Sequence, residues 1–218
     1  MKANFEACMA EVFKHEGGYV NDPHDPGGET NMGISKRSYP KENIRGMTRA
    51  RAAQIYRKDF WDKLKCDDLP AGLDLVAFDA GVNSGPARGA KWLQQAVGVD
   101  ADGKIGPQTI AAAQTTYGPA AVQRAIGFRL AFMMAAKAPG GKRLWDDFGK
   151  GWQRRCDEVQ ALAERMAMGQ TAMPPIIPDA PPITSKPVGN SNLPKTAVKL
   201  SGLAWLIKTI LDLLLRRK

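Results

Sequence analysis

The segment of residues 15–33 constrains the fold of this chain more than any other feature. Its nineteen positions hold five glycines, two prolines and four carboxylates, and they directly follow a helical pattern. Glycine and proline favour turns, so this segment is predicted to be a structured loop and not a helix. A carboxylate at a helix end, followed by a polar loop with more carboxylates, suits acid–base chemistry on an extended substrate. Glu16 and Asp25 are the first candidates for such a pair.

Apolar residues recur at helical spacing along most of the chain. In residues 4–15 they fall on one helical face, and Asn4 can cap that helix. Runs that alternate apolar and polar residues do not exceed a few positions, so we predict a mainly α fold. Further helices are expected to begin at Thr48, Pro70 and Thr109 and to cover residues 87–97, 119–138 and 143–168.

The charge of the chain is unevenly distributed. The net charge is +9, but residues 1–35 carry −4, residues 36–65 carry +7 and residues 195–218 carry +5. A basic balance favours a polyanionic partner such as nucleic acid, a membrane surface or an anionic cell wall. For residues 36–65, ordinary solvated helix faces are an equal alternative.

The cysteines and the N-terminus indicate where the chain is made. Three cysteines, an odd number without metal-like spacing, predict no disulfide framework and folding in a reducing compartment. The N-terminus lacks an uninterrupted apolar stretch, so no cleavable secretion signal is expected. We therefore expect synthesis in the cytoplasm, with delivery by another system if the substrate lies outside it.

The last 48 residues differ in composition from the rest. Residues 171–196 are rich in proline and small polar residues, which predicts an extended linker. Residues 197–218 predict an amphipathic helix, because Lys208 and Asp212 share a polar stripe opposite leucines and isoleucines. Its basic end suits an anionic membrane surface. A short spanning anchor and a helix folded back on the protein are the alternatives.

Several short motifs carry a family resemblance. They are Glu-Gly-Gly-Tyr at 16–19, Asp-Pro-Gly-Gly at 25–28, Thr-Asn-Met-Gly at 30–33 and Phe-Asp-Ala-Gly-Val-Asn-Ser-Gly-Pro at 78–86. This set resembles glycoside hydrolase family 108, the N-acetylmuramidases of bacteria and bacteriophages. Residues 92–110 resemble the peptidoglycan-binding region that follows in that family. The resemblance covers residues 5–167 and implies a lysozyme-like catalytic domain (1–90) with a helical peptidoglycan-binding half (91–170).

The resemblance also implies site residues. The family's catalytic residue corresponds to Glu16, and the order Glu16, Asp25, Thr30 is similar to the triad of phage-type lysozymes. Asp22 and Glu29 are the alternative carboxylates. The implied substrate-binding residues are Gly17, Gly18, Tyr19, Asn31, Gly33, Asn83 and Ser84. For Asn83 and Ser84, a structural cap is an equal alternative.

The implied reaction is hydrolysis of the β-1,4 bond between N-acetylmuramic acid and N-acetylglucosamine, for host lysis or wall remodelling. Peptidoglycan is the expected partner. We expect a holin or a secretion system to release the enzyme to the cell wall or periplasm. The tail is expected to allow association with the inner membrane. No cofactor, metal or nucleic-acid partner is expected, because a zinc peptidase normally needs more ligands than His15 and His24 offer. A lytic transglycosylase and a non-catalytic wall- or membrane-binding protein are the alternatives.

Overall fold

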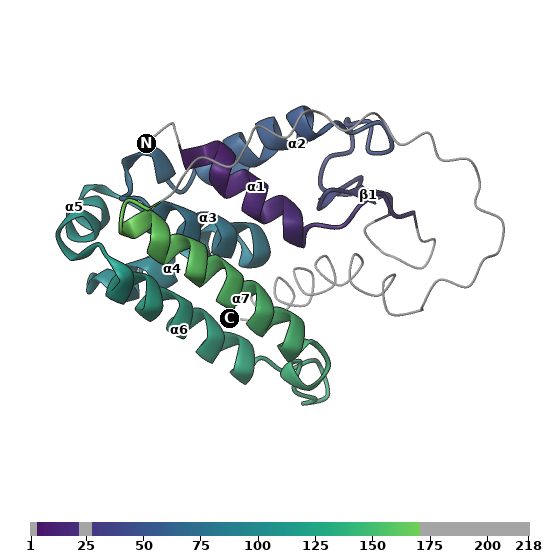
Figure 1. Cartoon of the computed structure of the whole chain (residues 1–218). Coiled ribbons are helices and arrows are strands. Elements are labelled where there is room, and N and C mark those ends of the chain that lie inside the picture. The colour runs from purple at the N-terminus through teal and green to yellow at the C-terminus, as the bar shows by residue number, and fades with distance from the viewer. Residues whose placement is uncertain (1–3, 22–27, 171–218) are drawn as a thin grey trace. The chain divides into compact units, whose positions relative to one another are not determined.

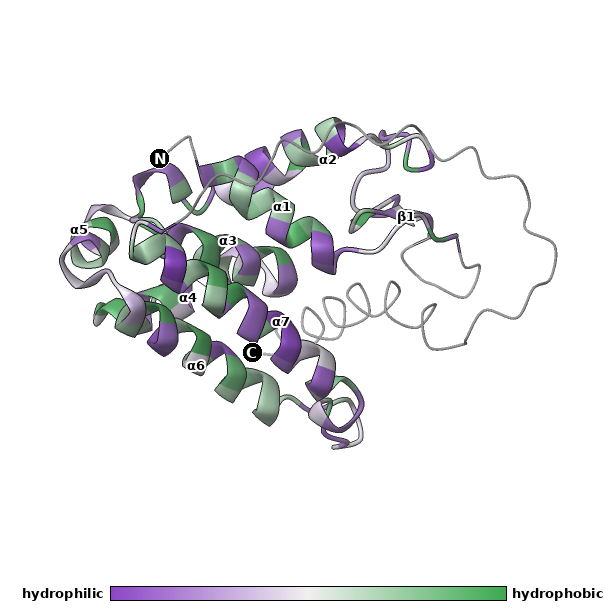
Figure 2. Cartoon of the chain, viewed as in Figure 1, coloured by the Kyte–Doolittle hydropathy of each residue, from purple (hydrophilic) through white to green (hydrophobic). Residues whose placement is uncertain are grey.

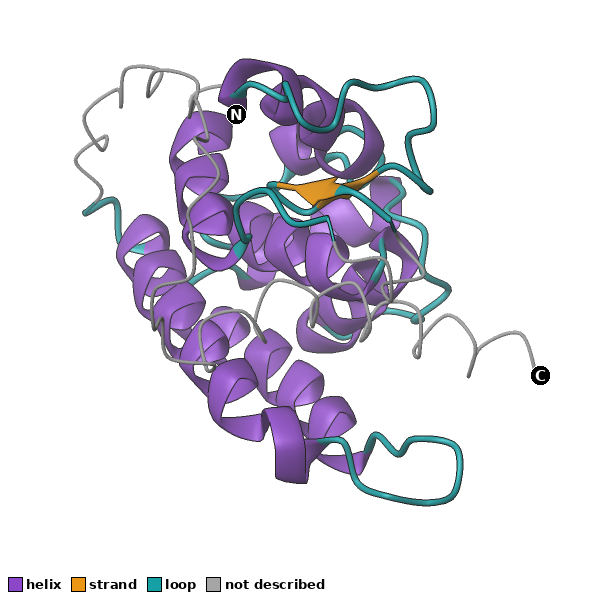
Figure 3. Cartoon of the chain, turned by 90° about the vertical axis from the view of Figure 1, so that its right-hand side faces the viewer, coloured by secondary structure: helices purple, strands orange, loops and turns teal. Residues whose placement is uncertain are grey.

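The computed structural model describes residues 4–21 and 28–170. Asp22, His24 and Asp25 lie outside these residues, as do the predicted linker and tail helix. Within the described part the chain is mainly helical, with two short strands, which confirms the predicted fold class (Figure 3). None of the helices described there is long and apolar enough to cross a membrane. The elements are α1 (Phe5–His15), β1 (Thr30–Asn31), β2 (Ile34–Ser35), α2 (Arg49–Tyr56), a π-helical turn (Arg57–Trp61), a 3₁₀ turn (Cys66–Asp68), α3 (Leu73–Ser84), α4 (Pro86–Val97), α5 (Pro107–Thr116), α6 (Pro119–Ala135) and α7 (Trp145–Ala167).

The described residues divide into two compact units. The larger unit comprises residues 4–11 and 56–170, and the smaller unit comprises residues 12–21 and 28–55. The two-domain boundary expected between residues 90 and 91 stays a prediction.

Helix α3 is the centre of the larger unit. All twelve of its residues are buried, and it contacts α4, α6 and α7 (Figure 1). Hydropathy explains the position, because the apolar residues of α3 are spread around the helix and do not form a single stripe (Figure 2), and such a helix is stable only when it is surrounded. Phe78 on α3 packs against Phe5 and Trp61, with ring centroids 6.0 and 5.2 Å away.

Three consecutive helices of the larger unit begin at a Gly-Pro pair. Pro86, Pro107 and Pro119 are the first residues of α4, α5 and α6, and each follows a glycine. Proline suits this position because its fixed φ is already helical and the N–H it lacks would have no partner inside the helix. These pairs therefore fix where the helices start.

Helices α3 and α4 pack with their backbones close together. A Cβ added at Gly89 of α4 would lie 2.8 Å from the carbonyl oxygen of Ala77 and 2.8 Å from the backbone nitrogen of Gly81, both on α3. Only glycine leaves room for this approach, which is tighter than ordinary side-chain packing allows.

One buried cluster of charges links α3 to α6 and α7. The Asp79 carboxylate accepts hydrogen bonds from Arg129 NH1 at 2.6 Å and from Arg155 NH2 at 2.7 Å. Asp79 is fully buried, and Arg129 and Arg155 are 1% and 7% exposed. Burial alone raises the pKa of Asp79, but the two guanidinium groups outweigh burial and hold that pKa below its ordinary value.

The three cysteines all lie in the larger unit. Cys8, Cys66 and Cys156 are free and buried. Burial raises the pKa of each thiol above its ordinary value. The reactive thiolate form is therefore scarce at neutral pH.

Candidate active site

Glu16 is the first residue after helix α1. Its backbone N–H donates to the carbonyl oxygen of Val12 at 3.2 Å, so the helical turn extends to it, and its side chain is half-buried. Gly17 and Gly18 follow directly. A Cβ added at Gly18 would meet no atom within 4 Å, so the backbone next to Glu16 has an open side.

The short hairpin of β1 and β2 turns at Met32 and Gly33. Thr30 pairs with Ser35 and Asn31 with Ile34, which leaves a two-residue loop. Both loop residues have positive φ, 48° at Met32 and 75° at Gly33. This is the geometry of a type I′ turn, which matches the twist of the strands but needs left-handed backbone at both positions. The turn itself therefore accounts for Gly33.

Backbone hydrogen bonds tie this hairpin to the residues after Glu16. The N–H of Met32 donates to the carbonyl oxygen of Gly17 at 3.0 Å. Val20 and Thr30 exchange two hydrogen bonds, each 2.8 Å long. The backbones of Glu16 and Thr30 therefore belong to one hydrogen-bonded framework in the smaller unit.

The side chains of Thr30 and Asn31, two of the predicted site residues, form different hydrogen bonds. The Thr30 hydroxyl donates to the carbonyl oxygen of Gly28 at 3.4 Å. Asn31 is buried and its amide donates to the carbonyl oxygen of Ile44 at 3.1 Å, so this side chain braces the loop that follows.

Tyr19 is the most exposed aromatic side chain of the smaller unit, at 37%. Its hydroxyl donates to Glu29 Oε1 at 2.8 Å, and this bond raises the pKa of Tyr19. The Arg45 guanidinium lies 5.7 Å from the ring centroid, within cation–π range. Glu29, one of the alternative carboxylates, therefore orients a tyrosine beside the Glu16 loop.

Asn83 and Ser84 are the last two residues of α3, in the larger unit. Both are buried, and the Ser84 hydroxyl donates to Asn83 Oδ1 at 3.1 Å. The smaller unit thus gathers Glu16, Gly17, Gly18, Tyr19, Thr30, Asn31 and Gly33, whereas Asn83 and Ser84 belong to the larger one and Asp25 lies outside the described residues. The catalytic and substrate-binding roles of all these residues stay predictions.

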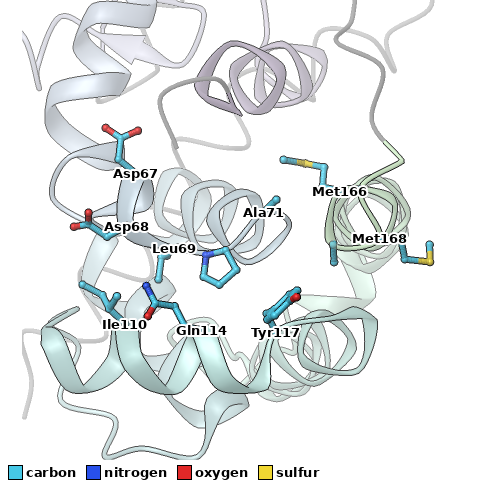
Figure 4. A pocket seen from close by; sticks show the side chains of 12 residues that line it. Asp67, Asp68, Leu69, Ala71, Ile110, Gln114, Tyr117, Met166 and Met168 are labelled. Atoms are coloured by element: carbon cyan, nitrogen blue, oxygen red, sulfur yellow. The ribbon is translucent and has the colours of Figure 1, made fainter.

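The larger unit has a groove of about 840 Å³ that the sequence analysis did not anticipate. Its lining is mainly apolar, and Figure 4 shows Gln114 of α5 and Tyr117, the residue after α5, along one side and Asp67 and Asp68 at one end. Asp67 accepts hydrogen bonds from Trp61 Nε1 at 3.1 Å and from Arg57. The remaining lining residues are Leu69, Pro70, Ala71, Ile110, Met166, Ala167, Met168 and Gly169.

A second, more open cavity of about 430 Å³ lies on the surface of α7. Trp145, Gly149, Lys150, Gln153, Arg154 and Asp157 line it. We call it the basic pocket. Sequence reasoning missed it, because helical spacing places Trp145, Gly149 and Lys150 near one another but does not show how the indole is turned.

Comparisons with known proteins agree with the motifs. Residues 9–85 match the family described as Glycosyl hydrolase 108, and residues 88–157 match the one described as Predicted Peptidoglycan domain. A solved structure titled "Structure of Brucella abortus SagA" is 38% identical, with a TM-score of 0.65, and the match covers 77% of this chain and 97% of that chain. No curated protein matches the chain. These findings confirm the predicted resemblance.

Proposed function

Because this chain belongs to glycosyl hydrolase family 108 and is a glycoside hydrolase directed at peptidoglycan, we propose that it is an N-acetylmuramidase with Glu16 as general acid. The bond cleaved is the β-1,4 linkage between N-acetylmuramic acid and N-acetylglucosamine. The site of action is the cell wall.

The proposed reaction needs a proton donor and a group that handles water. Glu16 gives its proton to the glycosidic oxygen as the bond from C1 to that oxygen breaks. Water then adds to C1, and its proton passes to a carboxylate, for which Asp25 is our candidate. Thr30 helps to position the water or to stabilise the cation. Asp25 then releases its proton to solvent, and a proton from solvent restores Glu16.

The hydrogen bond from Met32 to Gly17 is the observation that carries the assignment of Glu16. It joins the residue after Glu16 to the turn of the hairpin that begins with Thr30. A general acid must be held in a fixed position relative to the substrate, and a framework of backbone bonds supplies that rigidity. The open side at Gly18 leaves room for a sugar to approach.

Glu16→Gln tests the proposal most directly, with Glu29→Gln as the matched control. The substitution keeps the size of the side chain and removes the transferable proton, so hydrolysis of purified wall should fall by about 10²–10⁴-fold. The turbidity of a wall suspension measures it. Glu29→Gln should keep most of the activity, since the Glu29 carboxylate accepts the Tyr19 hydroxyl and a glutamine amide oxygen can still accept it. Near-normal activity of a folded Glu16→Gln variant would reject the assignment.

The product separates hydrolysis from the transglycosylase alternative. A hydrolase yields a reducing muramic acid end, whereas a transglycosylase yields an anhydro end that is lighter by one water. Mass spectrometry of the digested wall therefore decides between them.

Asp25→Asn and Asp22→Asn test the second carboxylate. We expect a strong loss of turbidity clearance for Asp25→Asn and a mild one for Asp22→Asn. The reverse order would assign the second role to Asp22.

We also propose that residues 197–218 hold the enzyme at an anionic membrane surface after release by a holin or a secretion system. Each basic residue near such a surface contributes about 1 kcal/mol to binding. Deleting residues 195–218 should leave hydrolysis of purified wall unchanged and abolish binding to anionic lipid vesicles. Equal vesicle binding by both proteins would reject this role.

A further inference from the structure

We propose that the basic pocket on α7 is a second peptidoglycan subsite, which binds a sugar ring of the strand together with a free carboxylate of its stem peptide. The inference names a substrate contact for the proposed wall hydrolase and rests on that function. It concerns binding to the wall and not the chemical step.

At one end of the basic pocket, the indole ring of Trp145 packs against Gly149. A Cβ added at Gly149 would lie 2.6 Å from Cε2, 2.7 Å from Cδ2 and 2.7 Å from Nε1 of Trp145. Three adjacent atoms of the five-membered ring at nearly equal distance mean that a face of the indole lies over Gly149. Trp145 also packs against Trp152, with ring centroids 6.0 Å apart, and Phe148 packs on Trp152 at 5.8 Å. The indole is therefore held in one orientation, as a sugar-stacking surface requires.

The charges that line the pocket are mainly positive. Lys150 and Arg154 are exposed and one helical turn apart, so their cationic ends lie on the same side of α7. Arg154 has only a loose ion pair with Glu158, at 4.0 Å, and its side chain is 66% exposed. Asp157 accepts a hydrogen bond from Gln153 at 2.7 Å. Two cations beside one engaged carboxylate favour an anionic ligand.

The acidic residues at the start of α7 do not cancel this charge. Asp146 pairs with Arg143 at 2.8 Å and Asp147 pairs with Lys142 at 2.7 Å. Asp146 and Asp147 therefore have cationic partners outside the pocket, and they do not compete for Lys150 and Arg154.

The chemistry of peptidoglycan fits this lining. Its strands combine sugar rings, which stack on aromatic faces, with stem peptides that bear free carboxylates. All six lining residues fall within residues 88–157, which match the peptidoglycan family. A volume of about 430 Å³ is within the usual range of small-ligand sites, about 300–1,000 Å³.

The larger groove is the weaker candidate for the same ligand. Both of its charged lining residues, Asp67 and Asp68, are acidic, and Asp67 already bonds to Arg57, so the lining offers no cation to stem-peptide carboxylates. Charge complementarity therefore favours the basic pocket.

The test measures binding of the full chain to purified wall. All variants carry Glu16→Gln so that the wall stays intact during cosedimentation. Lys150→Glu with Arg154→Glu should weaken binding about tenfold at low salt, and less at high salt, because two surface ion pairs become repulsions. The control, Lys58→Glu with Arg165→Glu, makes the same change in net charge at exposed positions elsewhere on the larger unit.

A second pair of variants tests the indole. Gly149→Ala should displace Trp145 and weaken wall binding, whereas Gly151→Ala on the same helix should not, since a Cβ there meets nothing within 4 Å. Thermal unfolding shows whether each variant folds. If the Gly149→Ala variant is unfolded, wall binding by the Lys150→Glu, Arg154→Glu variant alone tests the subsite.

The outcomes also separate this inference from the proposed function. Equal wall binding by the Lys150/Arg154 pair and the control pair would overturn the subsite. Loss of binding by the Lys150/Arg154 pair alone supports the subsite. Failure of the native enzyme to cleave the wall would reject the proposed hydrolysis but not the subsite.

Discussion

Helix α3 and the segment of residues 16–35 both fall within the glycosyl hydrolase match, yet different forces hold them together. Every residue of α3 is buried, and its charged Asp79 is enclosed by two arginines. The described residues of that segment, 16–21 and 28–35, include two strands of only two residues each, held by backbone hydrogen bonds and one buried amide. The first region depends on burial and the second on a few directional bonds.

This difference separates stability from activity. A two-stranded hairpin is marginal by itself, and each of its hydrogen bonds contributes only about 0.5–1.5 kcal/mol net. Substitutions in α3 should therefore lower the free energy of unfolding of the whole protein. Substitutions in residues 16–35 should change activity or local opening first.

Asp79→Asn should have the largest effect on stability. It leaves the guanidinium groups of Arg129 and Arg155 buried without a counter-charge, which typically costs about 3–5 kcal/mol. Chemical denaturation measures the loss. The control is Asp62→Asn, which breaks an exposed ion pair with Arg57 and should cost less than about 1 kcal/mol. Equal losses would mean that the buried cluster is not what stabilises α3.

Asp74→Asn should change how stability depends on pH. Burial raises the pKa of Asp74 from 3.8 to about 6, despite hydrogen bonds from Asn4 and from the N–H groups of Gly72 and Leu75. The folded protein therefore holds this proton more tightly than the unfolded chain. The favourable contribution is complete below pH 3.8 and is lost as the pH rises through about 6.

The loss in the native protein amounts to about 3 kcal/mol, because each pKa unit corresponds to about 1.4 kcal/mol. Asp74→Asn removes the ionisation, and a flipped Asn4 amide can accept its new donor. The stability of the variant relative to the native protein should increase by about that amount between pH 4 and pH 7. Parallel pH curves for the two proteins would show that Asp74 does not titrate in this range.

Gly89→Ala should cost about 1–3 kcal/mol, since its Cβ must push α4 away from α3. Gly127→Ala on α6 is the matched control. Its Cβ meets nothing within 4 Å and Gly127 is exposed, so there alanine should stabilise the helix by about 0.5–1 kcal/mol. Thermal unfolding of both variants should shift in opposite directions. Shifts of the same sign would contradict the close packing at Gly89.

Met32→Asn should give the smallest effect, confined to residues 16–35. Met32 has a left-handed backbone, which asparagine adopts more readily, so we expect a gain of about 0.5–1 kcal/mol. Hydrogen exchange of the Val20 and Thr30 amides should slow, while global unfolding shifts little. If global unfolding moved as much as in the α3 variants, the contrast between the two regions would fail.

Periodicity in the sequence was enough to predict most helices. The predicted ranges 4–15, 87–97 and 119–138 overlap α1, α4 and α6, because amphipathic spacing and helix-start residues are local signals. The Asp79 cluster had no such signal. Its partners lie 50 and 76 residues away, and only the packing of three helices brings them together.

In the candidate site, too, local sequence signals predicted some features and three-dimensional geometry determines the others. The sequence motifs located Glu16 and Thr30, and their family was confirmed. They did not show that Asn31 braces Ile44 or that Gly33 is required by the turn, since both facts depend on backbone geometry. The Trp145 and Gly149 contact was missed because a flat indole over a glycine depends on side-chain rotamers.

The buried thiols have a practical consequence for experiments on this protein. Cys8, Cys66 and Cys156 are the only cysteines in the sequence, and all three are shielded from solvent. A cysteine introduced at an exposed position would therefore be the preferred target of a maleimide dye. The three native cysteines would not need to be replaced first. A fluorophore attached at the exposed Asp157, which lines the basic pocket, would then follow wall docking in the otherwise native chain.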